Sequence, residues 1–222
     1  MRESLLEYEF IRNYLERRVL CSVRTGEKRA ALTFDDGPNP RHTPALLDLL
    51  KARNVKATFF LVGKRIREFP QLTRRIAAEG HEIGNHGYHH VPITVLPPPL
   101  LVREVSRTGE LIHEVTKTRP TYFRPPMGWI NGVALGVVRK LGYEPVIGTI
   151  HPRDFASPGI DVIVERIRKR ISPGSIIILH DGGWRKGVDR SQTIEAVNRV
   201  TVEHGQQGYR FETLSQLTGS RT

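Results

Sequence analysis

Short apolar runs and stretches of helical periodicity alternate along the sequence from residue 29 to residue 214. The apolar runs are rich in β-branched and aromatic residues, as in residues 57–62, whereas leucines recur at helical spacing in residues 43–54. Strands that alternate with helices form a parallel sheet covered by helices, because the chain must cross over before each new parallel strand. The alternation therefore predicts an α/β fold with a barrel-like, mostly parallel sheet.

The chain has 222 residues, 38% of them hydrophobic, which suits one domain with a buried core. We expect this domain to span residues 28–222. Residues 3–18 have the pattern of an amphipathic helix with Leu6, Phe10 and Tyr14 on one face, so residues 1–27 are interpreted as a helix and linker packed on the domain. The expected strands are 30–34, 57–62, 81–84, 122–123, 145–150, 175–179 and 209–211, and the expected helices after the first are 43–54, 69–79, 100–117, 133–141, 161–171 and 192–204.

The formal net charge of +11 favours an anionic partner, such as an acidic cell-wall polymer. Nucleic acid is not expected, because the basic residues are scattered and aromatic residues make up only 7% of the chain. The sequence contains no run of about 18 apolar residues, so we expect no membrane span. Arginine and glutamate occur throughout residues 1–20, which does not fit a signal peptide, and the location of the protein is left open. We expect a monomer.

Two adjacent carboxylates, Asp35 and Asp36, follow the first apolar run and precede Gly37 and Pro38. Both can point from the end of a strand into one space, where they would repel each other unless a cation lies nearby. The alternative is a solvated turn, because Asp-Asp-Gly-Pro is a common turn sequence. Cys21 is the only cysteine, so any metal here must be held by histidine and carboxylate.

His86 and His90 are four residues apart, a spacing that lets two imidazoles converge on one cation if the loop turns helically. Two histidines and one carboxylate leave a coordination position open for water, as in catalytic zinc sites. His89 is expected to point away from them. Chance is the alternative explanation of the spacing, because the chain has nine histidines.

Three further residues stand where strands end. Arg124 precedes two prolines that stiffen the backbone, and it could hold a carboxylate by a bidentate contact, although a surface arginine is an equally good explanation. His180 ends an apolar strand and suits acid–base chemistry, whereas a satisfied core histidine is the alternative. Asp154 is a candidate to orient that ring. In a parallel barrel all these side chains meet at the carboxyl ends of the strands, where active sites lie.

Over residues 29–217 the chain resembles the polysaccharide deacetylases, carbohydrate esterase family four. Five motifs occur in the order of that family: Thr33-Phe34-Asp35-Asp36-Gly37, Asn85 followed by His86 to His90, Arg124-Pro125-Pro126-Met127-Gly128, Asp154-Phe155, and Ile178-Leu179-His180. The resemblance implies a distorted (β/α) barrel with its active site at the carboxyl ends of the strands. It also implies a divalent metal, usually Zn²⁺ with Co²⁺ or Ni²⁺ as alternatives, and removal of acetyl groups from N-acetylated sugars.

Carried over by position, the resemblance assigns roles to individual residues. The metal ligands would be Asp36, His86 and His90. Asp35 would be the base, held by Arg124, and His180 would be the acid, tuned by Asp154. Met127 would donate its backbone N–H to the oxyanion, and Pro126, Ile178 and Trp184 would be further substrate-binding residues. Four positions depart from the family pattern, namely Gly87, Met127, His151 and Phe155, and they put rate and specificity in doubt more than reaction type. Trp129 and Trp184 could form sugar platforms or be ordinary packing residues.

The leading hypothesis is a metal-dependent hydrolase that removes acetyl groups from N-acetylglucosamine in a polysaccharide or oligosaccharide, of the peptidoglycan or chitin type. A second hypothesis keeps fold and metal but changes the substrate to a small amide or a cyclic ureide. A third is a catalytically silent carbohydrate-binding domain, which would need neither Asp35 nor His180. The substrate class suggests an extracellular or cell-envelope location.

Overall fold

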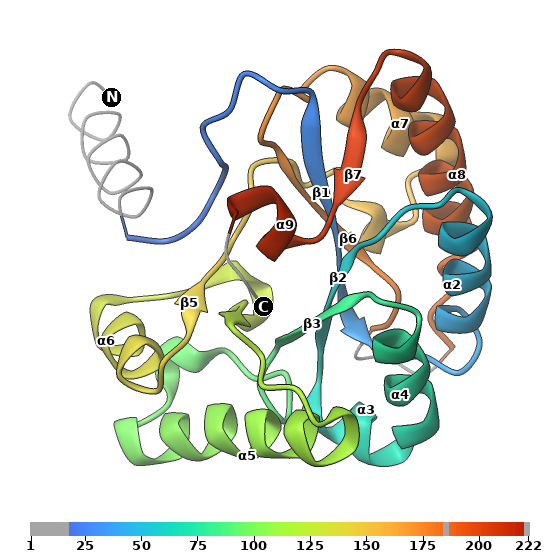
Figure 1. The fold of residues 1–222 in the computed structure, drawn as a ribbon. Coiled ribbons are helices and arrows are strands. Elements are labelled where there is room, and N and C mark those ends of the chain that lie inside the picture. The colour runs from blue at the N-terminus through green and yellow to red at the C-terminus, as the bar shows by residue number, and fades with distance from the viewer. Residues whose placement is uncertain (1–17, 184–186, 220–222) are drawn as a thin grey trace.

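A seven-stranded sheet forms the centre of the computed structural model, which describes residues 18–183 and 187–219 (Figure 1). Its strand order is β5-β4-β3-β2-β1-β6, and β7 pairs with the first part of β1. All pairs between these strands are parallel, as the alternation predicted. The strands are β1 (Arg29–Gly37), β2 (Thr58–Leu61), β3 (Glu82–Asn85), β4 (Tyr122–Phe123), β5 (Glu144–Pro145), β6 (Ile176–His180) and β7 (Arg210–Glu212).

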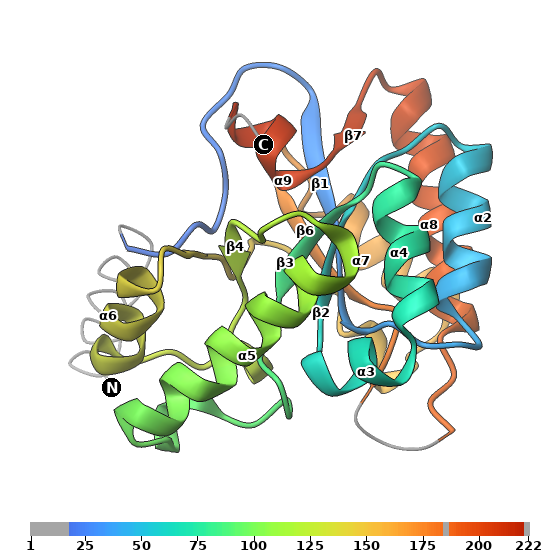
Figure 2. The same cartoon turned by 60° about the horizontal axis from the view of Figure 1, so that its bottom comes forward.

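Helices cover the outer face of this sheet. Figures 1 and 2 both show α2, α4 and α8 on one side, with α5 crossing the end of the sheet that holds β3 and β4. The helices are α2 (Thr43–Ala52), α3 (Gly63–Glu68), α4 (Pro70–Ala78), α5 (Pro98–Thr116), α6 (Gly132–Lys140), α7 (Ile160–Arg168), α8 (Ser191–Gln206) and α9 (Leu214–Thr218), with short 3₁₀ turns η1 (Ile93–Val95), η2 (Pro126–Gly128) and η3 (Asp154–Ala156). Among the described residues, no helix is long and apolar enough to cross a membrane.

Strand β1 separates two apolar cores. Its residues Ala30, Leu32 and Phe34 pack into the larger cluster under the helices. Ala31, on the opposite face, packs into a second cluster with residues from β2, β4 and β6 and with Leu214 of α9. Because side chains alternate across a strand, Asp35 shares the inward face of Ala31. The sequence of β1 therefore delivers Asp35 to the interior of the barrel.

The barrel is distorted where β5 would meet β6. In the described residues, isolated bridges link the two edges: Ile150 to Ile177 joins them directly and is parallel, whereas Leu20 to Val146 and Ser22 to Ser175 join them through residues 20–22. The predicted strand 145–150 is shortened to β5, because Gly148 lies at φ +108°, and a Cβ there would come within 3.1 Å of the Ile176 carbonyl oxygen. The predicted α/β fold with a distorted, mostly parallel barrel is thus confirmed, without full closure of the sheet.

Other differences are local. The triple proline was expected to interrupt the chain before a helix at residue 100, but α5 begins at Pro98, because proline fits the first turn of a helix, where its missing N–H is not needed. The sequence did not predict α3 or α9, which are six and five residues long, too short for a clear periodic signal. The helix predicted at residues 3–18 lies almost wholly outside the described residues, and the domain limits at 27 and 28 stay a prediction.

Candidate metal centre and acid–base groups

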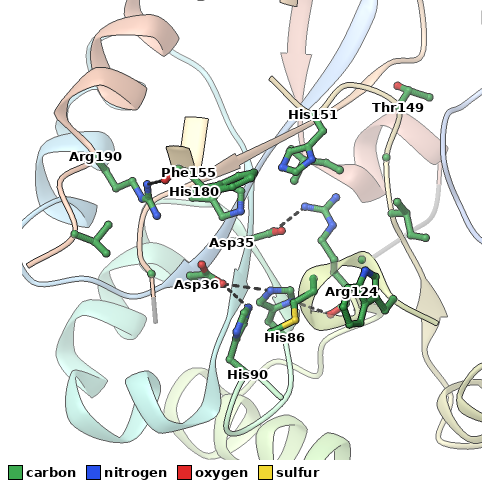
Figure 3. A pocket seen from close by; sticks show the side chains of 18 residues that line it. Asp35, Asp36, His86, His90, Arg124, Thr149, His151, Phe155, His180 and Arg190 are labelled. Atoms are coloured by element: carbon green, nitrogen blue, oxygen red, sulfur yellow. Dashed lines mark hydrogen bonds and ion pairs between the residues drawn. The ribbon is translucent and has the colours of Figure 1, made fainter. Parts of the chain in front are cut away.

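Asp36, His86 and His90 form a compact cluster at the carboxyl ends of β1 and β3 (Figure 3). One ligand atom from each lies within 4.8 Å of the others. The Oδ1 atom of Asp36 is 2.9 Å from Nε2 of His90 and 3.5 Å from Nε2 of His86. The four-residue spacing does not produce this convergence through a helical turn as expected. Gly87 at φ +74° and His90 at φ +57° fold the loop instead.

The backbone of Asp36 decides whether the cluster can form. By strict alternation its side chain would point to the helices, on the face opposite to Asp35. Asp36 instead lies at φ +72°, and the register between β1 and β2 shifts between Asp35 and Gly37. The left-handed conformation is one that aspartate tolerates better than most residues. It turns the carboxylate toward the two imidazoles.

The donor set fits a divalent cation. Nδ1 of His86 lies 2.7 Å from the carbonyl oxygen of Arg124, which makes Nδ1 the protonated nitrogen and leaves the lone pair on Nε2. Burial raises the pKa of Asp36, but its contacts with the two imidazoles and the charge of His180 hold that pKa well below its ordinary value. Its buried Oδ1 accepts no well-directed hydrogen bond from the described residues. A buried carboxylate beside two imidazole rings is a donor set that divalent zinc takes in proteins.

The residue that holds this loop was not predicted from the sequence. Oε2 of Glu104, on α5, accepts hydrogen bonds from the backbone N–H groups of Tyr88 (2.8 Å) and His89 (2.9 Å). The side-chain oxygen Oδ1 of Asn85 accepts a third hydrogen bond, from the backbone N–H of Gly87 at 2.9 Å. A carboxylate and an amide side chain thus hold the loop at three successive N–H groups. His89 is exposed and bonds Glu104, away from the cluster as predicted.

Asp35 is held by Arg124, as the motif predicted, but through one nitrogen and not in a bidentate contact. Nη1 of Arg124 donates to Oδ1 of Asp35 at 2.7 Å and to the hydroxyl of Thr33 at 2.6 Å. The guanidinium is fully buried, and its carbon lies 4.1 Å from the centre of the Phe60 ring. Burial lowers the pKa of Arg124, and Asp35 opposes that effect. The pair places a carboxylate beside the metal cluster with its second oxygen, Oδ2, not used by Arg124.

His180 and Asp154 form a second charged pair across the cavity. Nδ1 of His180 lies 2.8 Å from Oδ1 of Asp154, and the backbone N–H of His180 donates to Oδ2 at 2.9 Å. Thr193 of α8 donates a further hydrogen bond to Oδ2 at 2.9 Å. Burial lowers the pKa of His180, but the charge and hydrogen bond of Asp154 outweigh it and raise that pKa to about 9. The ring is therefore protonated at neutral pH, with Nε2 left for the cavity.

One cavity of about 830 Å³ is lined by the three residues of the cluster and by Asp35, Arg124 and His180, whereas Asp154 does not line it. Of the predicted substrate residues, Met127 and Ile178 line it, Pro126 is buried at the start of η2 and does not, and Trp184 lies outside the described residues. Trp129, which is 58% exposed, and Phe155, which is 49% exposed, add apolar surface to the rim. His151 stacks on Phe155 with ring centres 5.4 Å apart, and burial lowers its pKa. The cavity thus combines a floor of charged side chains with an apolar rim, as small-molecule sites do.

The comparisons with known proteins agree with this geometry. The sequence profile of the polysaccharide deacetylase family matches residues 22–146. The chain is 40% identical to a peptidoglycan-N-acetylglucosamine deacetylase of Bacillus cereus, over 90% of this chain and 92% of that protein. It is 36% identical to a chitooligosaccharide deacetylase of Bradyrhizobium, over 94% of this chain and 99% of that protein.

Solved structures give the same result for the fold. The crystal structure of the Bc1960 peptidoglycan N-acetylglucosamine deacetylase superposes with a TM-score of 0.89 at 30% identity, covering 94% of this chain and 97% of that one. A CE4 family pseudoenzyme from Bacillus anthracis superposes with a TM-score of 0.83 at 25% identity, covering 90% and 68%. Because a pseudoenzyme shares the fold, the fold alone does not carry the activity, and the side chains of the site must.

Proposed function

The chain belongs to the polysaccharide deacetylase family, a family of carbohydrate N-deacetylases, and we propose that it is a metal-dependent hydrolase that removes acetyl groups from N-acetylglucosamine in a peptidoglycan or chitin-type polymer. The observation that carries this proposal is that a carboxylate, which can accept a proton, and a charged imidazole, which can donate one, both lie beside the cluster of Asp36, His86 and His90. Asp35 is ion-paired with Arg124, and His180 is charged by Asp154. A hydrolase needs such a base and such an acid, whereas a silent binding domain needs neither.

The ligands would be Asp36, His86 and His90, and the donor set suits Zn²⁺, with Co²⁺ and Ni²⁺ as alternatives. A divalent ion at such a site acidifies water and polarises the amide carbonyl. The carbonyl contact from Arg124 fixes the His86 ring, and Glu104 fixes the loop between the two histidines. The protein thereby holds the three donors in place before any substrate arrives.

Asp35 is the base in this proposal. It accepts a proton from the attacking water as the oxygen of that water bonds to the acetyl carbon. The hydrogen bond from Arg124 to its Oδ1 holds the carboxylate at the edge of the cavity. Met127, at φ +62° on the edge of the cavity, would donate its backbone N–H to the oxygen that gains negative charge.

His180 is the acid. Its Nε2 proton passes to the amide nitrogen as the bond between that nitrogen and the acetyl carbon breaks, so that acetate and a free amine leave. Asp154 keeps the ring charged until that step. Asp35 must start deprotonated and His180 protonated, so the pH–rate profile should be bell-shaped.

The test is acetate release from chitin oligomers and from peptidoglycan, with and without a chelator. We expect release that the chelator stops and that added Zn²⁺ restores. If neither glycan yields acetate, the proposed activity is wrong. Comparing the two substrates also tests whether the +11 charge favours the anionic wall polymer, as we propose.

A further inference from the structure

Arg190 is a buried cation that the reaction described above does not use. It precedes α8, is 4% exposed and lines the cavity beside His180 and Phe155 (Figure 3). No carboxylate forms an ion pair with it within residues 18–183 and 187–219. Burying a charged side chain is unfavourable unless hydrogen bonds compensate for the lost water, so the hydrogen bonds of Arg190 must offset this cost.

Those contacts are two backbone carbonyl groups. Nε of Arg190 donates to the carbonyl oxygen of Gly182 at 2.7 Å, and Nη1 donates to that of Phe155 at 3.2 Å. Gly182 is two residues after His180, and Phe155 directly follows Asp154. A single planar guanidinium therefore ties together the two chain segments that carry the acid and its carboxylate partner.

The two segments are held differently: His180 ends β6 and the N–H of Gly182 donates to the carbonyl oxygen of Asp35 at 3.3 Å, whereas Asp154 lies outside the sheet. Asp154 begins the three-residue turn η3, and this turn is flanked by Arg153 at φ +58° and Ser157 at φ +50°. Left-handed residues other than glycine persist only where surrounding contacts impose them. Gly182 lies directly against the backbone of Asp36, where an added Cβ would meet the Asp36 carbonyl oxygen at 2.2 Å. A displacement of either segment would thus change the distance between His180 and Asp154.

The same helix start provides a second contact to this pair. Thr193, three residues after Arg190, donates its hydroxyl proton to Oδ2 of Asp154. Arg190 and Thr193 together fix η3 from the side of α8, while the backbone N–H of His180 fixes it from β6. Burial raises the pKa of Asp154, but His180, Thr193 and Arg190 lower it, so the carboxylate stays ionised.

We propose that Arg190 is a positioning residue for the acid of the reaction: by bridging Gly182 and Phe155 it sets the hydrogen-bond geometry between His180 and Asp154. The inference rests on the proposed deacetylation, in which His180 is the acid. The charged and titratable groups that face His180 are Asp154 on η3, Asp35 and Asp36 on β1, and His151, whose ring centre lies 5.9 Å from that of His180. Arg190 makes no hydrogen bond or ion pair with these side chains in the described structure: its charge lowers the pKa of Asp154 through space, and its two hydrogen bonds act on the backbone.

The test compares Arg190→Lys and Arg190→Gln with the wild-type protein, all loaded with Zn²⁺. Lysine keeps the charge but cannot donate to both carbonyl groups with the geometry of a planar fork, whereas glutamine loses the charge as well. We expect kcat to fall about 10- to 100-fold, with the larger loss in Arg190→Gln, because displacement of a reacting group by about 1 Å has effects of this size. KM should change less than about threefold, since neither carbonyl group is a substrate contact in this proposal.

A second readout separates positioning from simple stabilisation. Weaker contact with Asp154 lowers the pKa of His180, so the alkaline limb of the profile of kcat/KM against pH should move to lower pH in both variants. An NMR titration of the His180 ring reports the same change without any turnover. Arg139→Gln is the control, because Arg139 is exposed and also donates to a backbone carbonyl, that of Arg18, far from the cavity.

Three results would overturn the proposal. One is a wild-type kcat and alkaline limb in both variants. Another is a variant whose activity falls only in proportion to the fraction of protein that is unfolded, while the pKa of His180 in the folded protein stays at the wild-type value. If both variants fail to fold, Thr193→Val removes the hydrogen bond from α8 to Asp154, and an unchanged His180 pKa in that variant would exclude positioning from this helix start. Absence of acetate release from the wild-type protein would instead refute the proposed function, and the NMR titration would still test Arg190.

Discussion

Replacing Asp154 by asparagine should reduce deacetylation in a strongly pH-dependent way. Burial lowers the pKa of His180, and Asp154 is the main group that raises it to about 9, against an ordinary value of 6.5. The difference of about 2.5 units corresponds to about 3 kcal/mol of preference for the charged ring. Without the charge of Asp154, burial remains, and we expect the pKa to fall to about 6.5 or below.

The size of the effect follows from the protonated fraction of His180. At pH 8, a group with a pKa of about 9 is about 90% protonated, and one with a pKa of about 6.5 is about 3% protonated, a difference of about 30-fold. At pH 6 both are mostly protonated, so the rates should differ less than about twofold from this cause. A cation at the cluster would lower the pKa of His180 in both proteins, and therefore leaves the sign of the difference unchanged.

The assay is acetate release from a chitin oligomer between about pH 5 and pH 10. Asparagine can still accept hydrogen bonds from Thr193 and from the N–H of His180 through its one oxygen, so the fold should be retained. Asp161→Asn is the matched control, because Asp161 lies exposed on α7 and pairs only with Arg199 on the surface. An alkaline limb in Asp154→Asn that coincides with that of the wild-type protein would refute the reasoning, even if the rate were lower at every pH.

Three further substitutions test the other groups. Asp35→Asn should lower turnover about 10²- to 10⁴-fold while metal content stays near the wild-type value, because it removes only the base, and persistent turnover would show that Asp35 is not that base. His86→Ala should lose bound metal in elemental analysis, and normal occupancy would exclude His86 as a ligand. Glu104→Gln should raise the dissociation constant for Zn²⁺ about tenfold, since it weakens the hydrogen bonds that hold the loop between the two histidines. Glu114→Gln, on the exposed face of the same helix, is the control and should leave that constant unchanged. Equal dissociation constants in the two variants would contradict the role of Glu104.

Periodicity located most elements of the fold but few of their exact ends. The alternation of strand and helix was enough for the parallel sheet, because each pattern reflects local burial. It overestimated the strand at residues 145–150, since the position of Gly148 is set by contact with β6, about 28 residues later in the chain. It missed α3 and α9, whose stability depends on what they pack against, as Leu214 and Leu217 do in the barrel interior.

At the candidate site, too, the sequence predicted some features and missed others. The motifs contain most of the predicted residues that line the cavity, but they indicated neither the single-nitrogen contact of Arg124 nor the contacts of Glu104, Thr193 and Arg190. None of these three stands in a motif at the end of a strand. Their partners lie 8 to 39 positions away along the chain, and such pairs carry no local signal.

The sequence alone determined that acids, imidazoles and an arginine would gather at one end of a parallel barrel, because all of them follow strands, and parallel strands end at the same edge. Alternation along β1 also determined that Asp35 faces inward. Only the tertiary structure decided that Asp36 joins it. Its side chain belongs to the opposite face by alternation, and the left-handed backbone at φ +72°, imposed where β1 leaves its register with β2, turns it to His86 and His90. Such a conformation is too unfavourable for the local sequence to specify, and it depends on the packing of the whole barrel mouth.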